Sequence, residues 1–252
     1  MFDALKARDF QIAFRSHAEA ILAVDFPDAA AELEQVLLGV TIPIEELIAG
    51  GGGEAKVTQR LRRALSARSW RKLKFIIEKS INGAVQESIS HEVDHVRTFA
   101  PDRHIALEIG WNNKDPFFDR DLENFKRLHA DGAISLGVIV TRGPSLHDGM
   151  RDLVNRFLSG RGIGGFEELA RWGYTPTARQ RAEISRRVDR GQNPMPFAQA
   201  FTEHFVADKF GEATTHWRKL EDRLRRGVGH PCPLLLIGLP VGVLQFAAGR
   251  SA

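Results

Sequence analysis

The chain has a single cysteine, no long apolar run and no internal repeat, and these absences exclude several classes of protein. Cys232 has no partner within the chain, so an intramolecular disulfide is impossible and a reducing, cytoplasmic location is expected. No apolar run approaches the ~20 residues that span a bilayer. Residues 1–17 lack the apolar core of a signal peptide. We therefore expect no association with the membrane.

Two further ligand classes lack their sequence signals. The nine histidines and the lone cysteine show no paired Cys/His spacing, which argues against a structural zinc site. Residues 160–166, GRGIGGF, contain glycines that resemble a phosphate-binding loop, but no Lys-Ser or Lys-Thr follows them. We interpret this segment as a hinge.

Size and charge are compatible with one large domain, or two small ones, that binds an anionic partner. The 252 residues are 43% hydrophobic, enough to bury a large core. The net charge is +3, and arginine and lysine concentrate in residues 59–74, 179–190 and 217–227. Such clusters make the phosphate contacts that dominate nucleic-acid affinity, although basic helices are often only solvated faces.

The periodicity divides the chain into three parts. Residues 1–82 are expected to be helical, and residues 83–143 to form the catalytic core. Residues 144–252 are expected to serve DNA recognition, dimerisation and completion of the sheet. Glycines 50–53 interrupt the first part as a loop. The expected helices are 1–48 with a break at 26–28, 56–81, 116–129, 145–160, 166–172, 197–210 and 214–226. The expected strands after the first two are 134–141 and 233–239, and residues 174–196 form a polar arm or a helix ordered by DNA.

Two acidic residues lie in neighbouring extended runs of HEVDHVRTFAPDRHIALEIGWNNKDPFFDR, which begins at His91. Strand alternation places Glu92, Asp94 and Val96 on one face, and Leu107 and its i±2 neighbours on the core face, which leaves Glu108 on the polar side. A β-hairpin brings Asp94 and Glu108 together. Two carboxylates and the carbonyl of Ile109 suit Mg²⁺, a hard cation, although two acids on a hairpin are more often a solvated face.

The order strand, strand, helix, strand, with acids at the strand edges, resembles the PD-(D/E)XK nucleases, and among them the type II restriction endonucleases of the BamHI and BglII kind. The resemblance covers residues 80–143, with a looser similarity in residues 213–238. It implies a restriction-endonuclease-like α/β fold, a mixed five- or six-stranded sheet flanked by helices with an N-terminal helical part. It also implies that Asp94 and Glu108 bind the metal and that Gly110 occupies the third catalytic position.

Gly110 departs from the family pattern, in which Lys, Glu or Gln orients or activates the attacking water. Three explanations remain open. The chain is a variant altered to block cleavage, the site relies on a metal-bound hydroxide alone, or a neighbour such as Lys114, Glu92 or His91 substitutes. Glu87, Glu92 and Glu78 are further candidates to support the metal ligands from the preceding segment.

The loop after the second acidic strand is expected to contact DNA. Asn112, Asn113 and Lys114 would lie beside the scissile phosphate, where amides read base edges. A second candidate group is Thr214, Thr215, His216 and Arg218, which would open a helix at the DNA groove; for a lone histidine beside Trp217, packing or capping is the alternative.

The sequence therefore predicts a type II restriction endonuclease that cuts duplex DNA with Mg²⁺ at a short palindromic site. A catalytically impaired or noncatalytic DNA-binding protein of the same fold and a structure-specific repair nuclease are the alternatives. A palindrome presents two equivalent phosphates, so a two-fold homodimer is expected. Leu122, Phe125 and Leu128 form a stripe that either lies in the dimer seam or packs on the sheet.

Overall fold

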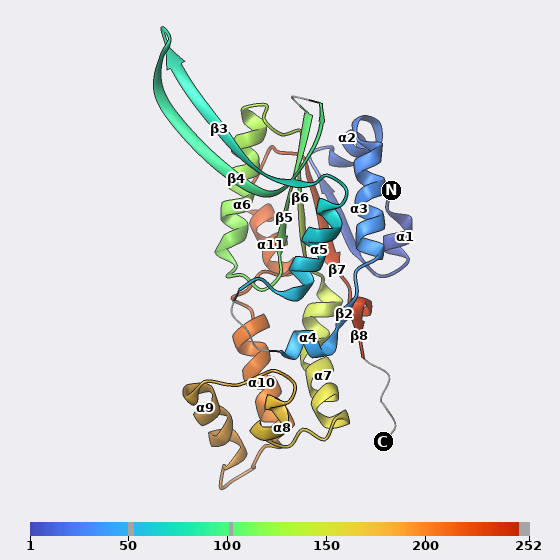
Figure 1. Cartoon of the computed structure of the whole chain (residues 1–252), viewed down its shortest axis with the longest axis vertical. Coiled ribbons are helices and arrows are strands. Elements are labelled where there is room, and N and C mark those ends of the chain that lie inside the picture. Colours follow the sequence, from blue (N-terminus) through green and yellow to red (C-terminus); the bar gives the residue numbers. More distant parts are fainter. Residues whose placement is uncertain (50–52, 101–102, 247–252) are drawn as a thin grey trace.

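A six-stranded mixed sheet forms the centre of the molecule (Figure 1). The computed structural model describes residues 1–49, 53–100 and 103–246. The strands of the sheet are β1 (Gln11–Arg15), β3 (Arg71–Ile81), β4 (Ala84–Ala100), β5 (Arg103–Gly110), β6 (Leu136–Arg142) and β7 (Leu234–Leu239). They lie in the order β1-β7-β6-β5-β4-β3, so the sequence prediction of a mixed sheet flanked by helices is confirmed.

The middle strands explain the apolar runs of the sequence. β5, β6 and β7 are parallel, and β1, β4 and β3 add antiparallel strands at the two sides. Every residue of β6 and β7 is buried, because helices cover both faces of the parallel part. β3 and β4 extend well past the sheet as a two-stranded ribbon (Figure 1). We refer to residues 77–90 of this ribbon as the arm.

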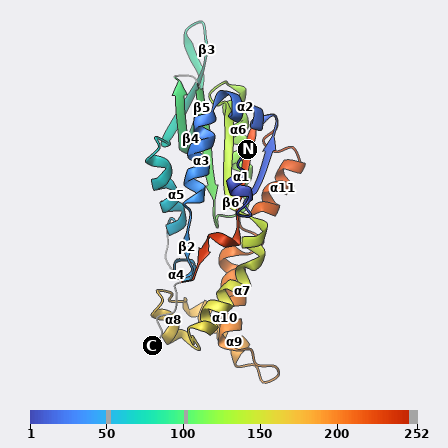
Figure 2. The ribbon, with the colours of Figure 1, turned by 90° about the vertical axis from the view of Figure 1, so that its right-hand side faces the viewer.

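Helices cover both faces of the sheet (Figures 1 and 2). Ile105 and Leu107 of β5 pack in the larger core with the N-terminal helices, whereas Ala106 packs in the smaller core with Phe118 and Leu220. Helices that contribute to the larger core include α1 (Asp3–Lys6), α2 (Ala18–Asp25), α3 (Pro27–Leu38), α4 (Ile44–Ile48), α5 (Lys56–Ser66) and α7 (Pro144–Gly160). Those of the smaller core are α6 (Pro116–Ala130) and α11 (Trp217–Arg225).

A helical part extends below the sheet in Figure 1, built around the C-terminal half of α7. A small parallel pair of strands lies above it. Its helices are α8 (Phe166–Ala170), α9 (Ala178–Val188) and α10 (Phe197–Phe210), and the small sheet consists of β2 (Ile42–Pro43) and β8 (Leu244–Gln245), next to the 3-10 helix η1 (Val241–Val243). Aromatic rings of α8 and α10 interlock, with Phe166 and Phe197 in an edge contact at 5.0 Å between ring centres.

Several predicted elements agree closely with the structure. The helix expected at 116–129 is α6, that at 145–160 is α7 and that at 197–210 is α10. The break expected at 26–28 falls between α2 and α3, where Pro27 occupies the first helical position. The polar segment 174–196 contains α9, whose N-cap Thr177 forms a capping box with Gln180. Of the predicted glycine loop, residues 50–52 lie outside the described residues.

Two helix predictions are wrong. The helix expected over 56–81 ends at Ser66, and residues 71–81 form β3. Asn82 and Gly83, both at positive φ, close the tight turn to β4 as in a type I′ hairpin. In the expected helical region 1–48, residues 11–15 form β1 because they pair with β7. Long-range pairing overrides the local helical pattern in both cases.

The apolar stripe of α6 is part of the core. The side chains of Leu122, Phe125 and Leu128 are fully buried within the chain, against the sheet and α11. The prediction that this stripe forms a dimer seam is therefore wrong, and its alternative, packing on the sheet, is confirmed.

Close packing of α6 on the sheet yields a first prediction. A Cβ on Gly137 would lie 2.9 Å from Cγ of Phe125 and 3.0 Å from Cδ2 of Leu234. Gly137→Ala is expected to lower the free energy of unfolding by about 1–3 kcal/mol, because the core must shift to admit the methyl group. Urea unfolding measures the change. Gly164→Ala is the control, since no atom lies within 4 Å of its Cβ position; equal effects of both substitutions would contradict the packing explanation.

Candidate functional site

The two predicted acids lie on the neighbouring strands β4 and β5, beside a β-bulge in β4. Arg71 pairs with Val96 and Leu73 with Val93, so Lys72 faces two residues, Asp94 and His95. A bulge leaves one residue out of the regular ladder and turns its side chain. The backbone N–H of Asp94 donates to Oε1 of Glu108 at 3.2 Å. The backbone of Asp94 and the carboxylate of Glu108 are thus adjacent, and convergence of the two carboxylates on a metal stays a prediction.

The same bulge corrects the predicted face assignment. Asp94 and Glu92 are exposed, as expected, but Val96 is buried with Val93 on the other side of the strand. His95 is buried as well. The alternation fails because the extra residue shifts the two-residue period between Val93 and Val96.

A third acid, Asp121 of α6, lies close to this pair. Burial raises the pKa of Glu108 to about 8, with smaller contributions from the negative charges of Asp121 and Asp94. Asp121 is 8% exposed, and burial raises its pKa as well, against the effect of Arg120. Arg120 donates to Oδ1 of Asp121 at 2.8 Å. The local excess of carboxylates favours binding of a cation.

Sequence reasoning missed Asp121, although a signal was present. The residue lies three positions after Phe118 and four before Phe125, within the stripe that α6 buries. An acid on the apolar face of an amphipathic helix is unusual, and it therefore marks a position with a polar partner or a ligand.

Gly110 has no room for a side chain in this packing. A Cβ there would lie 2.8 Å from Cε1 of Phe118 and 3.2 Å from Cβ of Thr215. Phe118 itself is fully buried. The ring therefore occupies the space into which a third catalytic side chain would begin to extend.

A cavity of about 650 Å³ opens beside Asp94, on the side of the sheet that α5 covers. Asp94 and Ile109 both line it, as do the loop residues Asn112 and Asn113. Its cationic lining residues are Arg62, Arg71 and Lys72. A hollow that places carboxylates and several cations together is suited to a substrate with negatively charged groups.

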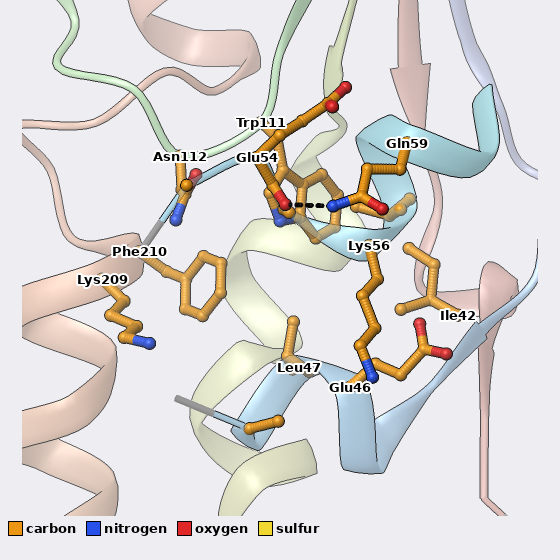
Figure 3. Close-up of a pocket in the computed structure, with 14 residues that line it drawn as sticks. Ile42, Glu46, Leu47, Glu54, Lys56, Gln59, Trp111, Asn112, Lys209 and Phe210 are labelled. Carbon is orange, nitrogen blue, oxygen red and sulfur yellow. Dashed lines mark hydrogen bonds between the residues drawn. The ribbon is translucent and has the colours of Figure 1, made fainter. Parts of the chain in front are cut away.

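A smaller cavity of about 250 Å³ adjoins the first one (Figure 3). Asn112 and Glu54 line both cavities. Trp111, Lys209 and Phe210 line only the smaller one, and Gln59 donates to the carbonyl of Glu54 at 2.8 Å across its wall. Asn112 therefore lies at the junction of the two cavities.

The loop of residues 111–115 is held by a buried arginine that sequence reasoning also missed. Arg142 is fully buried at the end of β6. Its Nε donates to the carbonyl of Trp111 at 2.8 Å, and its Nη2 donates to Oγ1 of Thr214 at 2.6 Å and to the carbonyl of Thr215 at 2.7 Å. The backbone N–H of Thr215 in turn donates to the carbonyl of Asn113 at 2.8 Å.

This network corrects part of the predicted recognition surface. Thr214, Thr215 and His216 are at most 4% exposed, so their side chains face the interior and do not reach base edges in this conformation. Thr214 and Thr215 brace the 111–115 loop instead. Arg218 is exposed and forms an ion pair with Asp148, and its contact with DNA stays a prediction.

The remaining predicted acids separate into two groups. Glu92 lies beside the site, since Lys72 contacts both Glu92 and Asp94. Glu87 pairs with Lys79 in the arm, seven residues from Asp94 along β4 or about 20 Å at the usual strand rise. Glu78 belongs to the same arm. Glu78 and Glu87 are therefore too distant to support a metal at Asp94, because the segment is a long ribbon that leads away from the sheet.

A second cluster of ligand-type side chains lies behind the 111–115 loop. Among the described residues, His147, Glu212 and His216 place ligand atoms within 4.8 Å of one another. Arg142 Nη1 lies 3.2 Å from Nδ1 of His147. A guanidinium only donates, so Nδ1 accepts and the proton of the ring is on Nε2, which faces Glu212 at 3.2 Å. A metal would need the lone pair at Nε2, so these residues fit a hydrogen-bonded cluster better than a metal site.

The basic clusters differ in their surroundings. In residues 217–227, Arg223 pairs with Asp115, Arg225 with Glu221 and Arg226 with Asp222. The cluster at residues 179–190 lies in α9 and the turn after it, and Arg179 pairs with Glu183. α9 lies near the end of the molecule opposite the arm (Figure 1). Only the cluster at residues 59–74 contributes cations to the cavity beside Asp94.

The histidine cluster predicts acid sensitivity. Burial lowers the pKa of His216 from 6.5 to about 4, aided by His147, Arg142 and Arg218 and opposed by Glu212. Between pH 6.5 and 4 the unfolded chain therefore binds more protons at this residue. Its contribution to stability is complete above pH 6.5 and is lost as the pH falls toward 4.

We expect His216→Phe to reduce the loss of unfolding free energy between pH 6.5 and 4 by about 1–2 kcal/mol. Urea unfolding at a series of pH values provides the measurement. His230→Gln, a change at an exposed histidine, is the control. An identical pH dependence in the wild-type chain and in His216→Phe would refute the assignment.

Comparison with known proteins is consistent with this geometry. The sequence model of a family described as restriction endonuclease BglII/BglIII matches residues 10–239, well beyond the segment whose resemblance the motifs indicated. No curated protein matches the chain significantly. Within the described residues, no helix is both long and apolar enough to cross a membrane. The matched segment includes the whole six-stranded sheet and both acids, and the chain belongs to the BglII/BglIII family of restriction endonucleases.

Proposed function

We propose that the protein is a type II restriction endonuclease that hydrolyses both strands of duplex DNA at a short palindromic site with Mg²⁺. The observation that carries the proposal is the contact between Asp94 and Glu108 at adjoining strands, beside a cation-lined cavity, in a chain of this family. A phosphodiester combines the negative charge that the cavity cations attract with the oxygen ligands that a divalent metal prefers.

Asp94, Glu108 and the carbonyl of Ile109 are the proposed ligands of the metal. All three groups offer oxygen, and Glu108 shares a buried environment with Asp121, so a divalent cation would relieve the repulsion among the carboxylates. When bound, Mg²⁺ would polarise the scissile phosphate and lower the pKa of water. The protein would supply the orientation of Asp94 and Glu108 through the bulge and the buried strand β5.

The 111–115 loop is the proposed contact to bases and to the backbone near the cut. Asn112 and Asn113 line the cavity beside Asp94, and amide side chains match the edges of adenine. Lys114 is exposed and follows them directly. Arg142 fixes the path of this loop from behind, so recognition and metal ligation would share one rigid support.

A two-fold homodimer remains part of the proposal, because a palindrome has two equivalent scissile phosphates. Its seam must lie outside the apolar stripe of α6, which the chain buries for itself. Sedimentation of a monomer both free and on its DNA site would contradict the dimer.

Because Gly110 supplies no third catalytic side chain, a second candidate function is that of a noncatalytic DNA-binding protein. The Phe118 ring fills the space beside Gly110. This packing is compatible with a protein in which glycine is the natural residue, and also with an enzyme whose third catalytic side chain has been lost. Metal-dependent digestion of a plasmid or phage DNA into discrete fragments distinguishes these functions. Fragments without discrete ends would indicate a repair nuclease that recognises DNA structure.

Removal of either proposed ligand should abolish cleavage and leave the fold intact. We expect Asp94→Asn and Glu108→Gln each to reduce single-turnover cleavage by at least 1000-fold, because the metal loses a ligand, while specific DNA binding in Ca²⁺ persists. The matched control is Asp131→Asn, at the C-terminal end of α6. Full activity of either ligand variant would overturn the site.

The role of Gly110 requires a variant that also makes space. Gly110→Glu alone must displace the Phe118 ring, so we compare it with Gly110→Glu combined with Phe118→Leu. If a third side chain is missing, cleavage should rise by one order of magnitude or more, most clearly in the double variant. No gain over Phe118→Leu alone would indicate that glycine is sufficient.

The cations of the cavity should dominate the salt dependence of DNA binding. Arg62→Gln with Arg71→Gln is expected to reduce the slope of log affinity against log salt by about one unit for each phosphate that the protein no longer neutralises. Arg179→Gln with Arg190→Gln tests the alternative cluster at the far end. If the slope is unchanged in the Arg62/Arg71 double variant and reduced in the Arg179/Arg190 double variant, DNA follows the far cluster and not the cavity.

A further inference from the structure

The chain lacks a side chain at the third catalytic position, and the bulge places a lysine from another strand next to the acids. Lys72 of β3 stands opposite the two bulged residues, Asp94 and His95. Its Nζ lies 2.6 Å from Oε1 of Glu92 and 3.6 Å from Oδ1 of Asp94. Lys72 and Asp94 also line the same 650 Å³ cavity.

The ion pairs of Lys72 are of a kind that exchanges easily. The side chains of Lys72, Glu92 and Asp94 are all more than half exposed, so water screens their attraction. Lysine is a point charge on a flexible four-carbon stem with three donors. The ammonium can therefore leave Asp94 at little cost when a stronger cation binds there, and can reach another anion within the cavity.

We infer that Lys72 is a catalytic residue that supplies a phosphate-binding cation to a site whose position 110 has no side chain. In the free protein it neutralises Asp94, and in the complex it donates to a non-bridging oxygen of the scissile phosphate. This inference rests on the proposed function. The physical reason is exchange of partners: a divalent cation at Asp94 repels the ammonium, while the phosphate that arrives with DNA attracts it.

Other neighbours are less suited to this role. His91 is 8% exposed and is packed into the sheet. Glu92 carries the wrong charge for a phosphate and is itself bound to Lys72. The guanidinium of Arg120 is held by Asp121 and stacks 4.5 Å from the centre of the Phe117 ring. Among the described residues, Lys72 has the only cationic side chain within 4 Å of the Asp94 carboxylate.

The inference predicts two effects of opposite sign in Lys72→Met. Mn²⁺ should bind the DNA-free protein about 3- to 10-fold more tightly, because a competing cation no longer lies beside Asp94. Single-turnover cleavage of a duplex should fall about 10- to 100-fold, because the scissile phosphate no longer has this donor. Lys72→Arg should retain much of the cleavage rate. If Lys72 had only a structural role, Lys72→Met would not raise Mn²⁺ affinity while lowering the cleavage rate.

Lys74→Met is the matched control. Lys74 is exposed on the same strand, two residues further on and in register with Glu92. It should leave Mn²⁺ affinity and cleavage within about 2-fold of the parent. Mn²⁺ titration followed by electron paramagnetic resonance measures the Mn²⁺ affinity. The cleavage rate is measured on a duplex that contains the site mapped from digestion of phage DNA.

The outcomes separate this inference from the proposed function. If the parent chain cuts DNA and Lys72→Met has the same Mn²⁺ affinity and rate, the role of Lys72 is refuted and the endonuclease remains. If the parent chain cuts no DNA with any divalent metal, the proposed function fails, and tighter Mn²⁺ binding in Lys72→Met then supports only the exchange at Asp94. Absence of Mn²⁺ binding to the parent overturns the inference.

Discussion

The buried guanidinium of Arg142 is the interaction on which the geometry of the site depends. A charge in the interior is costly unless every donor is satisfied, and the five N–H groups of an arginine require as many acceptors. Arg142 finds them in Trp111, Phe210, Thr214, Thr215 and His147. These partners come from separate segments of the chain. Their bonds to Arg142 therefore fix the relative positions of the end of β6, the 111–115 loop, the start of α7 and the connection between α10 and α11. Burial lowers the pKa of Arg142 to about 9, which still leaves it charged at neutral pH.

A second constraint is the balance of charge around the bulge in β4. Burial, and after it the negative charges of Asp121 and Asp94, raises the pKa of Glu108, and Arg120 offsets part of this effect. Lys72 forms an ion pair with Asp94. The protein therefore holds its acids in an arrangement that is unfavourable without a cation. Such an arrangement is typical of functional sites, where binding of a ligand relieves the cost of preorganisation. The rigid support comes from β5, which is anchored by Ile105 and Leu107 on one face and by Ala106 on the other.

Much of the core of the fold was predictable because its signals are local. The apolar runs of β6 and β7, the amphipathic stripe of α6 and the proline at its first turn each indicate one structure. β3 was not predictable in the same way. Its basic residues follow a helical pattern from α5 without interruption, yet Leu73, Phe75 and Ile77 also lie two residues apart, as on one face of a strand, and pack against the smaller core. Only the pairing with β4 selects the strand, and that pairing depends on residues up to 25 positions away, as between Arg71 and Val96.

By itself, the sequence determined the family resemblance, the two acids at Asp94 and Glu108, the glycine at position 110 and the order of the core elements, because these are properties of residue type and short-range spacing. Tertiary structure decided which other side chains accompany the acids. Asp121, Lys72 and Arg142 reach the site from α6, β3 and β6, and Thr214, Thr215 and His216 are turned into the interior instead of toward DNA. The physical reason is that a helix register, a bulge and a buried charge are fixed by contacts between segments distant in sequence, so no local pattern contains them.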